Sequence, residues 1–132
     1  YDYAPGSHQA QPSATVQALL DAHRRSLGRA PRSFSDADIV QRLVLSLVNE
    51  GARLLQEGIA SRASDIDVVY VLGYGFPLHR GGPMHYAEEL GLAEVVRRLE
   101  HLAHTDPEDA AFWQPAPLLQ RLAAQGQGFA DL

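Results

Sequence analysis

The feature that most constrains the fold is a long row of apolar residues with helical spacing between positions 39 and 55. Two sets recur every four positions in this stretch: Ile39, Leu43 and Leu47, and Val40, Val44 and Val48. Residues four apart lie on the same face of an α-helix, so the two sets form one side, which continues to Leu54 and Leu55. The pattern predicts a long helix whose broad apolar face is central to the core.

Signals at both ends define the limits of this helix. Ser35 precedes it as an N-cap, and Asp38 stands three residues later, an acidic variant of the capping box. Phe34 and Ile39 have the spacing of a hydrophobic staple. Gly58 is the expected stop, so the helix should have about six turns.

Further helices are predicted where a cap, a glycine or a proline precedes spaced apolar residues. The predicted ranges are 14–27 after Ser13, 83–90, 92–102 after Gly91, 107–113 after the cap Asp106, and a last helix from 117. Positions 83, 107 and 117 are prolines, which the first helical position accepts. Residues 126–128, Gly-Gln-Gly, are expected to fray.

The segment that follows Ser64 carries conflicting signals. Residues 68–72 read Val-Val-Tyr-Val-Leu, which has strand propensity. Ser64 with Asp67 three residues later is a helix start signal. A lone strand in a helical chain would have no partner, so we predict a helix over 65–72.

The chain is therefore predicted to be all-α, with about six or seven helices in a single compact domain. Its 132 residues allow it to bury about two-thirds of its unfolded surface. Residues 1–12 contain proline, glycine and few apolar side chains, so we expect a linker or arm there and the domain over 13–132. Because the first residue is Tyr1 and not methionine, we expect a piece cut from a longer protein.

Composition excludes several classes of protein. The chain has no cysteine, so disulfides and thiolate metal sites are excluded. A net charge of −5 argues against nucleic acid as a partner, and no apolar run is long enough for a membrane span. All eleven basic residues are arginine. We read this as codon bias in a GC-rich genome and expect a bacterial cytoplasmic protein.

The residues Gly73, Tyr74, Gly75, Phe76 and Pro77 imitate a dinucleotide-binding turn. That chemistry needs a strand, three spaced glycines and a helix N-terminus on the pyrophosphate. Here Leu78 stands at the third glycine position and a proline lies inside the turn. The segment is better interpreted as a rigid loop, with no cofactor bound by this chain.

The turn of Arg80, Gly81, Gly82 and Pro83 is a candidate anion site. Two glycines expose backbone N–H groups at a helix start, and an arginine lies beside them. The alternative is a tight entry turn in which Arg80 forms a structural salt bridge. The histidine pairs 79 and 85, and 101 and 104, lack an evident acidic ligand, so no metal site is predicted.

Three polar residues, Asn49, Glu50 and Arg53, interrupt the apolar pattern of the long helix. Their spacings of three and four residues allow Arg53 to pair with both of the others. Catalysis by Glu50 would require burial that perturbs its pKa. The alternative is a buried polar network that holds neighbouring loops. No nucleophile–base pair or paired-carboxylate arrangement stands out, so the residues alone indicate a helical domain with one special loop.

Residues 39–60 and 63–87, followed by Gly91-Leu92, resemble the C-terminal helical domain of 3-hydroxyacyl-CoA dehydrogenases. The run from Gly-Tyr-Gly-Phe-Pro at 73–77 to Arg-Gly-Gly-Pro-Met at 80–84 looks most like the last such domain of multifunctional fatty-acid β-oxidation enzymes. Those enzymes join enoyl-CoA hydratase, an NAD-binding domain and two helical copies. The resemblance covers about residues 35–103 and implies a fold like the 6-phosphogluconate dehydrogenase C-terminal domain.

The resemblance also implies a reaction and its parts. The family oxidises 3-hydroxyacyl-CoA to 3-ketoacyl-CoA with NAD, using a His and a Glu of an NAD-binding domain that this chain lacks. The first helical copy supplies an Asn in an Ile-Val-Asn-Arg context, and Gln41 stands at that position here. Gln is one methylene longer, which would displace a positioned hydrogen bond. We therefore expect a second, non-catalytic copy.

Such a copy implies particular partners. We expect it to pack on the remaining domains of the parent enzyme, whose substrate is an acyl-CoA, and we consider a homodimer of the fragment as a further candidate. The loop at 73–77, the turn at 80–83, and Asn49, Glu50 and Arg53 are then interface or structural residues. Two alternatives stay open: a module that binds a CoA phosphate or another anion at Arg80, Gly81 and Gly82, and a helical interaction adaptor.

Overall fold

A computed structural model describes all 132 residues and contains seven α-helices, three short 3-10 turns and no strand. The prediction of an all-α chain with six or seven helices is confirmed. The chain divides into two units, Tyr1–Ser35 and Asp36–Leu132, which are described separately. None of the helices is both long enough and apolar enough to cross a membrane.

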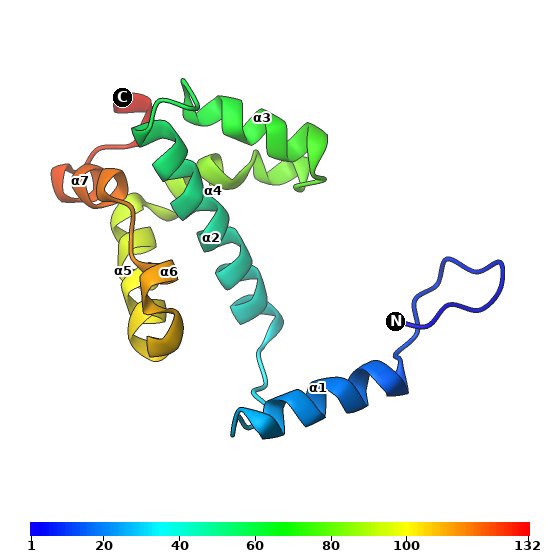
Figure 1. Cartoon of the computed structure of the whole chain (residues 1–132). Helices are drawn as coiled ribbons and strands as arrows, with labels where there is room; N and C mark the ends of the chain where they lie inside the picture. The colour runs from blue at the N-terminus through cyan, green and yellow to red at the C-terminus, as the bar shows by residue number, and fades with distance from the viewer. The chain divides into compact units, whose positions relative to one another are not determined.

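The first unit contains helix α1 (Ala14–Ser26) and the arm before it, which forms a loop closed by a backbone bridge between Asp2 and Gln11 (Figure 1). The helix ends before Gly28, as predicted, where φ is +63°. It buries none of its own side chains. The assignment of residues 1–12 to a linker and of 13–132 to one domain stays a prediction.

The second unit is built around α2 (Asp36–Gln56). Helices α3 (Ala63–Gly73) and α4 (Pro83–Leu90) pack against each other on one side of it, as Figure 1 shows. Helix α5 (Leu92–Thr105) packs against the short α6 (Ala110–Trp113) and against α7 (Pro117–Gln125). The 3-10 turns are η1 (Leu78–Arg80), η2 (Pro107–Asp109) and η3 (Phe129–Asp131).

The core of this unit lies where α2, α4, α5 and α7 meet. Its fully buried large side chains are Leu45, Val48, Met84, Val95, Leu99, Leu119 and Leu122. Met84 fills the space above Gly51, where a Cβ would lie 2.5 Å from the Met84 sulfur. Glycine at this position therefore lets α4 approach the middle of α2 closely.

Helix α2 differs from the prediction in how much of its apolar face it buries. Its buried residues all lie between Leu45, near the middle of the helix, and Ala52. In the first half, Val40 is 53% exposed and Leu43 is 62% exposed. Helical spacing identifies an apolar face but not the length over which another element covers it. The helix is central to the core, as predicted, but the apolar face of its first half is largely open to solvent.

Three expectations about helix starts and the C-terminal tail are also corrected. Arg62, and not Ser64, precedes the first residue of α3. The side chain of Asp106 does not cap the helix that follows it but pairs with Arg42 of α2. The tail does not fray at 126–128, because Phe129 beyond it is buried and its N–H donates to the Glu88 carboxylate. For Asp106 and Phe129, a partner distant in sequence outweighs the local signal.

One prediction concerns the acid stability of α5. The carboxylate of Glu94 accepts hydrogen bonds from Arg97 Nε at 2.6 Å and Arg98 Nε at 2.7 Å. These bonds lower the pKa of Glu94 from 4.5 to about 2. A carboxylate with a depressed pKa in the folded state stabilises the fold above its unfolded pKa, and that stabilisation is lost as pH falls from 4.5 towards 2.

Glu94→Gln is therefore expected to lower the urea midpoint near neutral pH and to have little effect at the acidic end of that window. Urea unfolding followed by helical circular dichroism at several pH values measures this. Glu100→Gln is the matched control, since Glu100 lies exposed on the same helix and makes no ion pair. An equal effect of both substitutions, or one independent of pH, would contradict the assignment.

Candidate functional site

The surface of the second unit contains an apolar groove of about 510 Å³. Helix α2 forms one wall, and the end of α3 with the loop after it forms the other. The lining residues are Val40, Leu43, Val44, Leu47, Tyr70, Tyr74, Gly75, Phe76, Pro77, Arg80 and Tyr86. We call this set the apolar groove.

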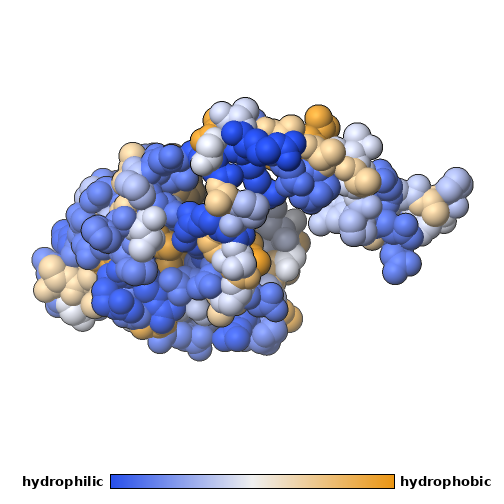
Figure 2. Space-filling model, turned by 90° about the horizontal axis from the view of Figure 1, so that it is seen from below, coloured by the Kyte–Doolittle hydropathy of each residue, from blue (hydrophilic) through white to orange (hydrophobic).

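The groove is part of a wider apolar surface. Leu72 and Leu78, just outside the groove, are 80% and 78% exposed, and Tyr74 at its rim is 76% exposed. Figure 2 shows apolar side chains, in orange, reaching the surface among hydrophilic ones on the face that it presents. An apolar groove with further exposed apolar side chains close to it in sequence marks a binding face more often than single exposed leucines do.

The polar groups of the groove lack partners within the chain. Arg80 is exposed, makes no ion pair, and is the only charged residue that lines the groove. The hydroxyls of Tyr70, Tyr74 and Tyr86 make no hydrogen bond to the chain. The rings of Tyr70 and Tyr74 contact each other at 5.4 Å between centroids, with their planes tilted by 38°. An apolar floor with an aromatic and arginine rim is typical of protein interfaces.

The predicted glycine loop at 73–77 forms the end of this groove. It follows an α-helix, turns at Gly75 with φ of +74°, and is held by Phe76 N–H, which donates to the Tyr70 carbonyl at 3.0 Å. The 3-10 turn η1 comes next, and not an α-helix. A dinucleotide site requires a strand before the turn and a helix after it, so the residues present do not fit NAD.

The predicted anion turn at Arg80–Pro83 encloses a carboxylate of the chain itself. Asp67 Oδ1 accepts the N–H of Met84 at 2.7 Å, and Asp67 Oδ2 accepts the N–H of His85 at 3.1 Å. Burial raises the pKa of the Asp67 carboxyl, and these two bonds partly offset the rise. The first N–H groups of α4 are therefore already occupied, and the Gly81 N–H donates to the Leu78 carbonyl at 3.1 Å.

The sequence prediction did not include Asp67 among the site residues. Its position three residues after Ser64 suggested a capping partner for its own helix. The carboxylate instead binds the N-terminus of α4, which starts sixteen residues later. The only signal in the sequence for the close approach of α3 to this turn is the glycine at 82. In the structure its φ is +121°, and a Cβ there would clash with Asp67.

The polar residues of α2 hold the entry to α7. Asn49 is 2% exposed, its Nδ2 donates to the Gln114 carbonyl at 2.9 Å, and its Oδ1 accepts Ala116 N–H at 2.8 Å. Arg53 donates to the same Gln114 carbonyl at 3.2 Å and lies 3.3 Å from the carboxylate of Glu50. Glu50 is exposed and makes no contact beyond this pair.

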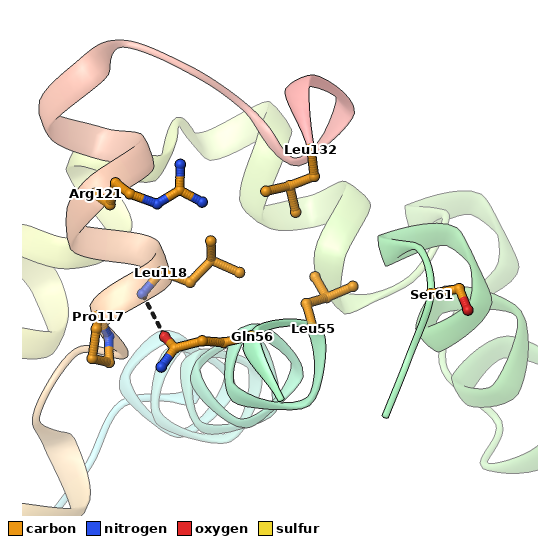
Figure 3. A pocket seen from close by; sticks show the side chains of 7 residues that line it. All are labelled: Leu55, Gln56, Ser61, Pro117, Leu118, Arg121 and Leu132. Atoms are coloured by element: carbon orange, nitrogen blue, oxygen red, sulfur yellow. Dashed lines mark hydrogen bonds between the residues drawn. The ribbon is translucent and has the colours of Figure 1, made fainter. Parts of the chain in front are cut away.

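A second hollow, of about 430 Å³, lies between the end of α2 and the start of α7 (Figure 3). The Arg121 side chain extends beside it from α7, opposite Leu55 of α2 and near the terminal Leu132. Gln56 Oε1 accepts the N–H of Leu118 at 2.9 Å at its edge. The hollow contains one arginine and no acid or histidine, so it holds no acid–base pair.

The remaining titratable residues form no catalytic arrangement. No group of three or more histidines and carboxylates is close enough to hold a metal ion. A third hollow is lined by Asp67, His85 and Glu88, but both carboxylates accept backbone N–H groups. Gln41, half-buried on α2, lies 3.5 Å from Arg98 of α5 and does not line the apolar groove.

Comparison with known proteins finds similar segments in large multifunctional enzymes. The chain is 46% identical over 122 residues to the peroxisomal bifunctional enzyme of Danio rerio, and 40% identical over 116 residues to that of Homo sapiens. It is 34% identical over 124 residues to a glyoxysomal fatty acid β-oxidation multifunctional protein of Cucumis sativus. These matches cover 92%, 88% and 91% of this chain but only 17%, 16% and 17% of the relatives.

These relatives correct the expected cellular location. The expectation of a bacterial cytoplasmic protein is contradicted, because the relatives named here are peroxisomal or glyoxysomal enzymes of animals and a plant. The expectation came from the excess of arginine over lysine. That ratio reports codon usage, and it carries no information about a compartment.

The family assignment comes from the residues that build the second unit. The family model of the 3-hydroxyacyl-CoA dehydrogenase C-terminal domain matches residues 39–128. This range includes the polar residues of α2, the loop at 73–77 and the turn at 80–83 on which the resemblance was based. The chain belongs to the family of 3-hydroxyacyl-CoA dehydrogenase C-terminal domains.

Proposed function

We propose that this chain is a non-catalytic scaffold domain of a multifunctional fatty-acid β-oxidation enzyme. The parent enzyme would oxidise a 3-hydroxyacyl-CoA to the 3-ketoacyl-CoA with NAD, which is bound by another domain. The role of this chain is to pack on the other domains and hold them in place. The supporting observation is the apolar groove, which exposes Leu43 and Tyr74 to solvent in the chain alone.

Gln41 supports a non-catalytic role. It stands where the resemblance places an Asn that acts near the substrate, and its amide lies 3.5 Å from Arg98. The side chain is half-buried between α2 and α5. An amide held against a neighbouring helix is poorly placed to orient a substrate hydroxyl. We therefore assign Gln41 to packing and the isolated chain to no turnover of its own.

Other assignments fit the geometry less well. An anion such as a CoA phosphate at the turn of residues 80–83 would have to displace the Asp67 carboxylate from the N–H groups of Met84 and His85. Self-association of the chain through the apolar groove would bring Arg80 of two copies to one interface with no lining carboxylate between them. Both are therefore weaker candidates than packing on a different domain.

The test is reconstitution of the parent enzyme from two pieces. The remainder of the parent and this chain are expressed separately, and NADH formation from a 3-hydroxyacyl-CoA is measured for each piece and for the mixture. We expect activity only in the mixture and in the intact parent, because docking restores the support that the active domains need. Each piece is first checked for folding by circular dichroism.

Two outcomes would contradict the proposal. Turnover by this chain alone would show that it carries its own active site, and Gln41 and Glu50 would be the first residues to vary. Full activity of the remainder without this chain, equal to that of the intact parent, would show that no scaffold is needed. Restoration by an unrelated helical protein of equal charge would indicate a nonspecific effect, so that protein is the control.

A further inference from the structure

The apolar groove contains one charge that determines what can dock there. Arg80 lines the groove, is exposed to water and has no acidic partner in the chain. A segment that covers the groove removes water from this guanidinium. A buried and unpaired charge costs several kcal/mol, so an occupant that binds stably must bring an acceptor for it.

The groove cannot supply a carboxylate for Arg80 to a second copy of itself. Its lining residues include no aspartate and no glutamate. Two copies facing each other through this surface would bury two guanidinium groups and no carboxylate. The charge of the groove thus favours a different surface, one that carries an acidic residue.

The shape of the groove defines the rest of the occupant. The wall from Val40 to Leu47 spans eight residues of α2, whose seven steps cover about 10 Å along the helix axis. The opposite wall carries the rings of Tyr70, Tyr74 and Phe76. An open trough between a helix and an aromatic loop accepts the apolar ridge of another helix, with two to three anchor side chains over about two turns.

We infer that the apolar groove receives a helix from another domain of the parent enzyme, and that this helix carries an apolar ridge and a carboxylate that pairs with Arg80. This inference rests on the proposed scaffold function and specifies the surface and chemistry of the contact. The tyrosines that line the groove have hydroxyls without a partner in the chain, which polar groups of the docked helix would meet.

The test measures binding of this chain to the separately expressed remainder of the parent by titration calorimetry. Leu43→Glu is expected to abolish detectable binding, because it places a charge on the groove wall. Arg80→Gln is expected to weaken binding about 30-fold or more, since the partner carboxylate is then left buried and unpaired. Arg80→Lys is expected to retain more affinity than Arg80→Gln, because it keeps the positive charge.

Matched controls separate the groove from the rest of the surface. Arg121→Gln removes another exposed arginine without an ion pair, at the hollow of Figure 3. Ile59→Glu adds a charge at an apolar residue that is 69% exposed outside the groove. Both controls are expected to bind like the unaltered chain. All variants change exposed side chains, so their unfolding midpoints should match that of the unaltered chain. These midpoints are measured first.

The outcomes distinguish this inference from the proposed function. No binding of the unaltered chain to the folded remainder would overturn both. Binding that is equal for Leu43→Glu and the unaltered chain would leave the scaffold function standing and overturn the groove as its contact. Equal affinities of Arg80→Lys and Arg80→Gln would exclude a carboxylate. A dimer of the chain alone that Leu43→Glu dissociates would show that a second copy occupies the groove.

Discussion

Gly82→Ala is expected to destabilise the second unit by about 3–5 kcal/mol, a large share of the stability of a domain this size. Two effects add at this position. Gly82 has φ of +121°, a conformation that residues with a Cβ rarely adopt, at a cost of about 1–3 kcal/mol. A Cβ there would also lie within 2.5 Å of Asp67 Cγ, so α3 or the turn must move.

The movement has a further cost because Asp67 is the cap of α4. Its carboxylate accepts the N–H groups of Met84 and His85, and it is 9% exposed. Displacement of the carboxylate leaves these N–H groups without their partner, and a lost hydrogen bond to a charged group costs about 1.5–3 kcal/mol. Urea unfolding followed by the fluorescence of Trp113, the only tryptophan, measures the loss.

Gly91→Ala is the control that separates the two effects. Gly91 also has a positive φ, +88°, but no heavy atom lies within 4 Å of the position that its Cβ would take. This substitution is expected to cost the strain alone, about 1–3 kcal/mol. If Gly82→Ala cost no more than Gly91→Ala, the close packing of α3 on the turn would be wrong.

Local signals predicted the parts of the fold that local chemistry determines. Pro83 at the first position of α4 and Gly91 after its last residue set both limits of that helix, and the structure has the same limits. The ambiguous segment at 65–72 is helical, as predicted, because no other strand exists with which it could pair. Each of these signals acts within a few residues, so it does not depend on how distant parts of the chain pack.

The features that the sequence did not reveal all depend on contacts between distant residues. Phe129 follows two glycines and looked like part of a fraying tail, but its ring is buried in the core. Asp106 had the position of a cap and instead pairs with Arg42, sixty-four residues away. The expected packing on other domains implied an exposed apolar face, but periodicity alone could not locate it on α2, because it cannot distinguish a covered face from an open one.

Asn49→Ala is expected to destabilise the second unit by about 2–4 kcal/mol. The Asn49 amide is the only side chain that bonds the Ala116 N–H, and both residues are almost fully buried. Its removal leaves a donor unsatisfied in the core and an opening that is too enclosed for bulk water. The Gln114 carbonyl keeps its bond from Arg53, so the loss falls mainly on the entry to α7.

Gln56→Ala is the matched control, because Gln56 lies on the same helix and bonds the N–H of Leu118 in the same segment. Gln56 is exposed and lines the hollow of Figure 3, so water can replace its amide. The expected cost is about 1 kcal/mol or less. Equal losses for the two alanine variants, measured by urea unfolding, would show that burial of the Asn49 amide is not what makes it important.

Asn49→Asp tests the direction of the bond to Gln114, because it keeps the size of the side chain and removes the donor. An ionised carboxylate at this position would face the Gln114 carbonyl, which Asn49 Nδ2 contacts at 2.9 Å in the native chain. Burial should raise the pKa of the introduced carboxyl, and its protonated form can donate to that carbonyl.

A raised pKa in the folded state means that the stabilisation is present at low pH and lost as pH rises through that pKa. The stability difference between Asn49→Asp and the native chain should therefore shrink as pH falls. A difference that is independent of pH would contradict the burial of this group.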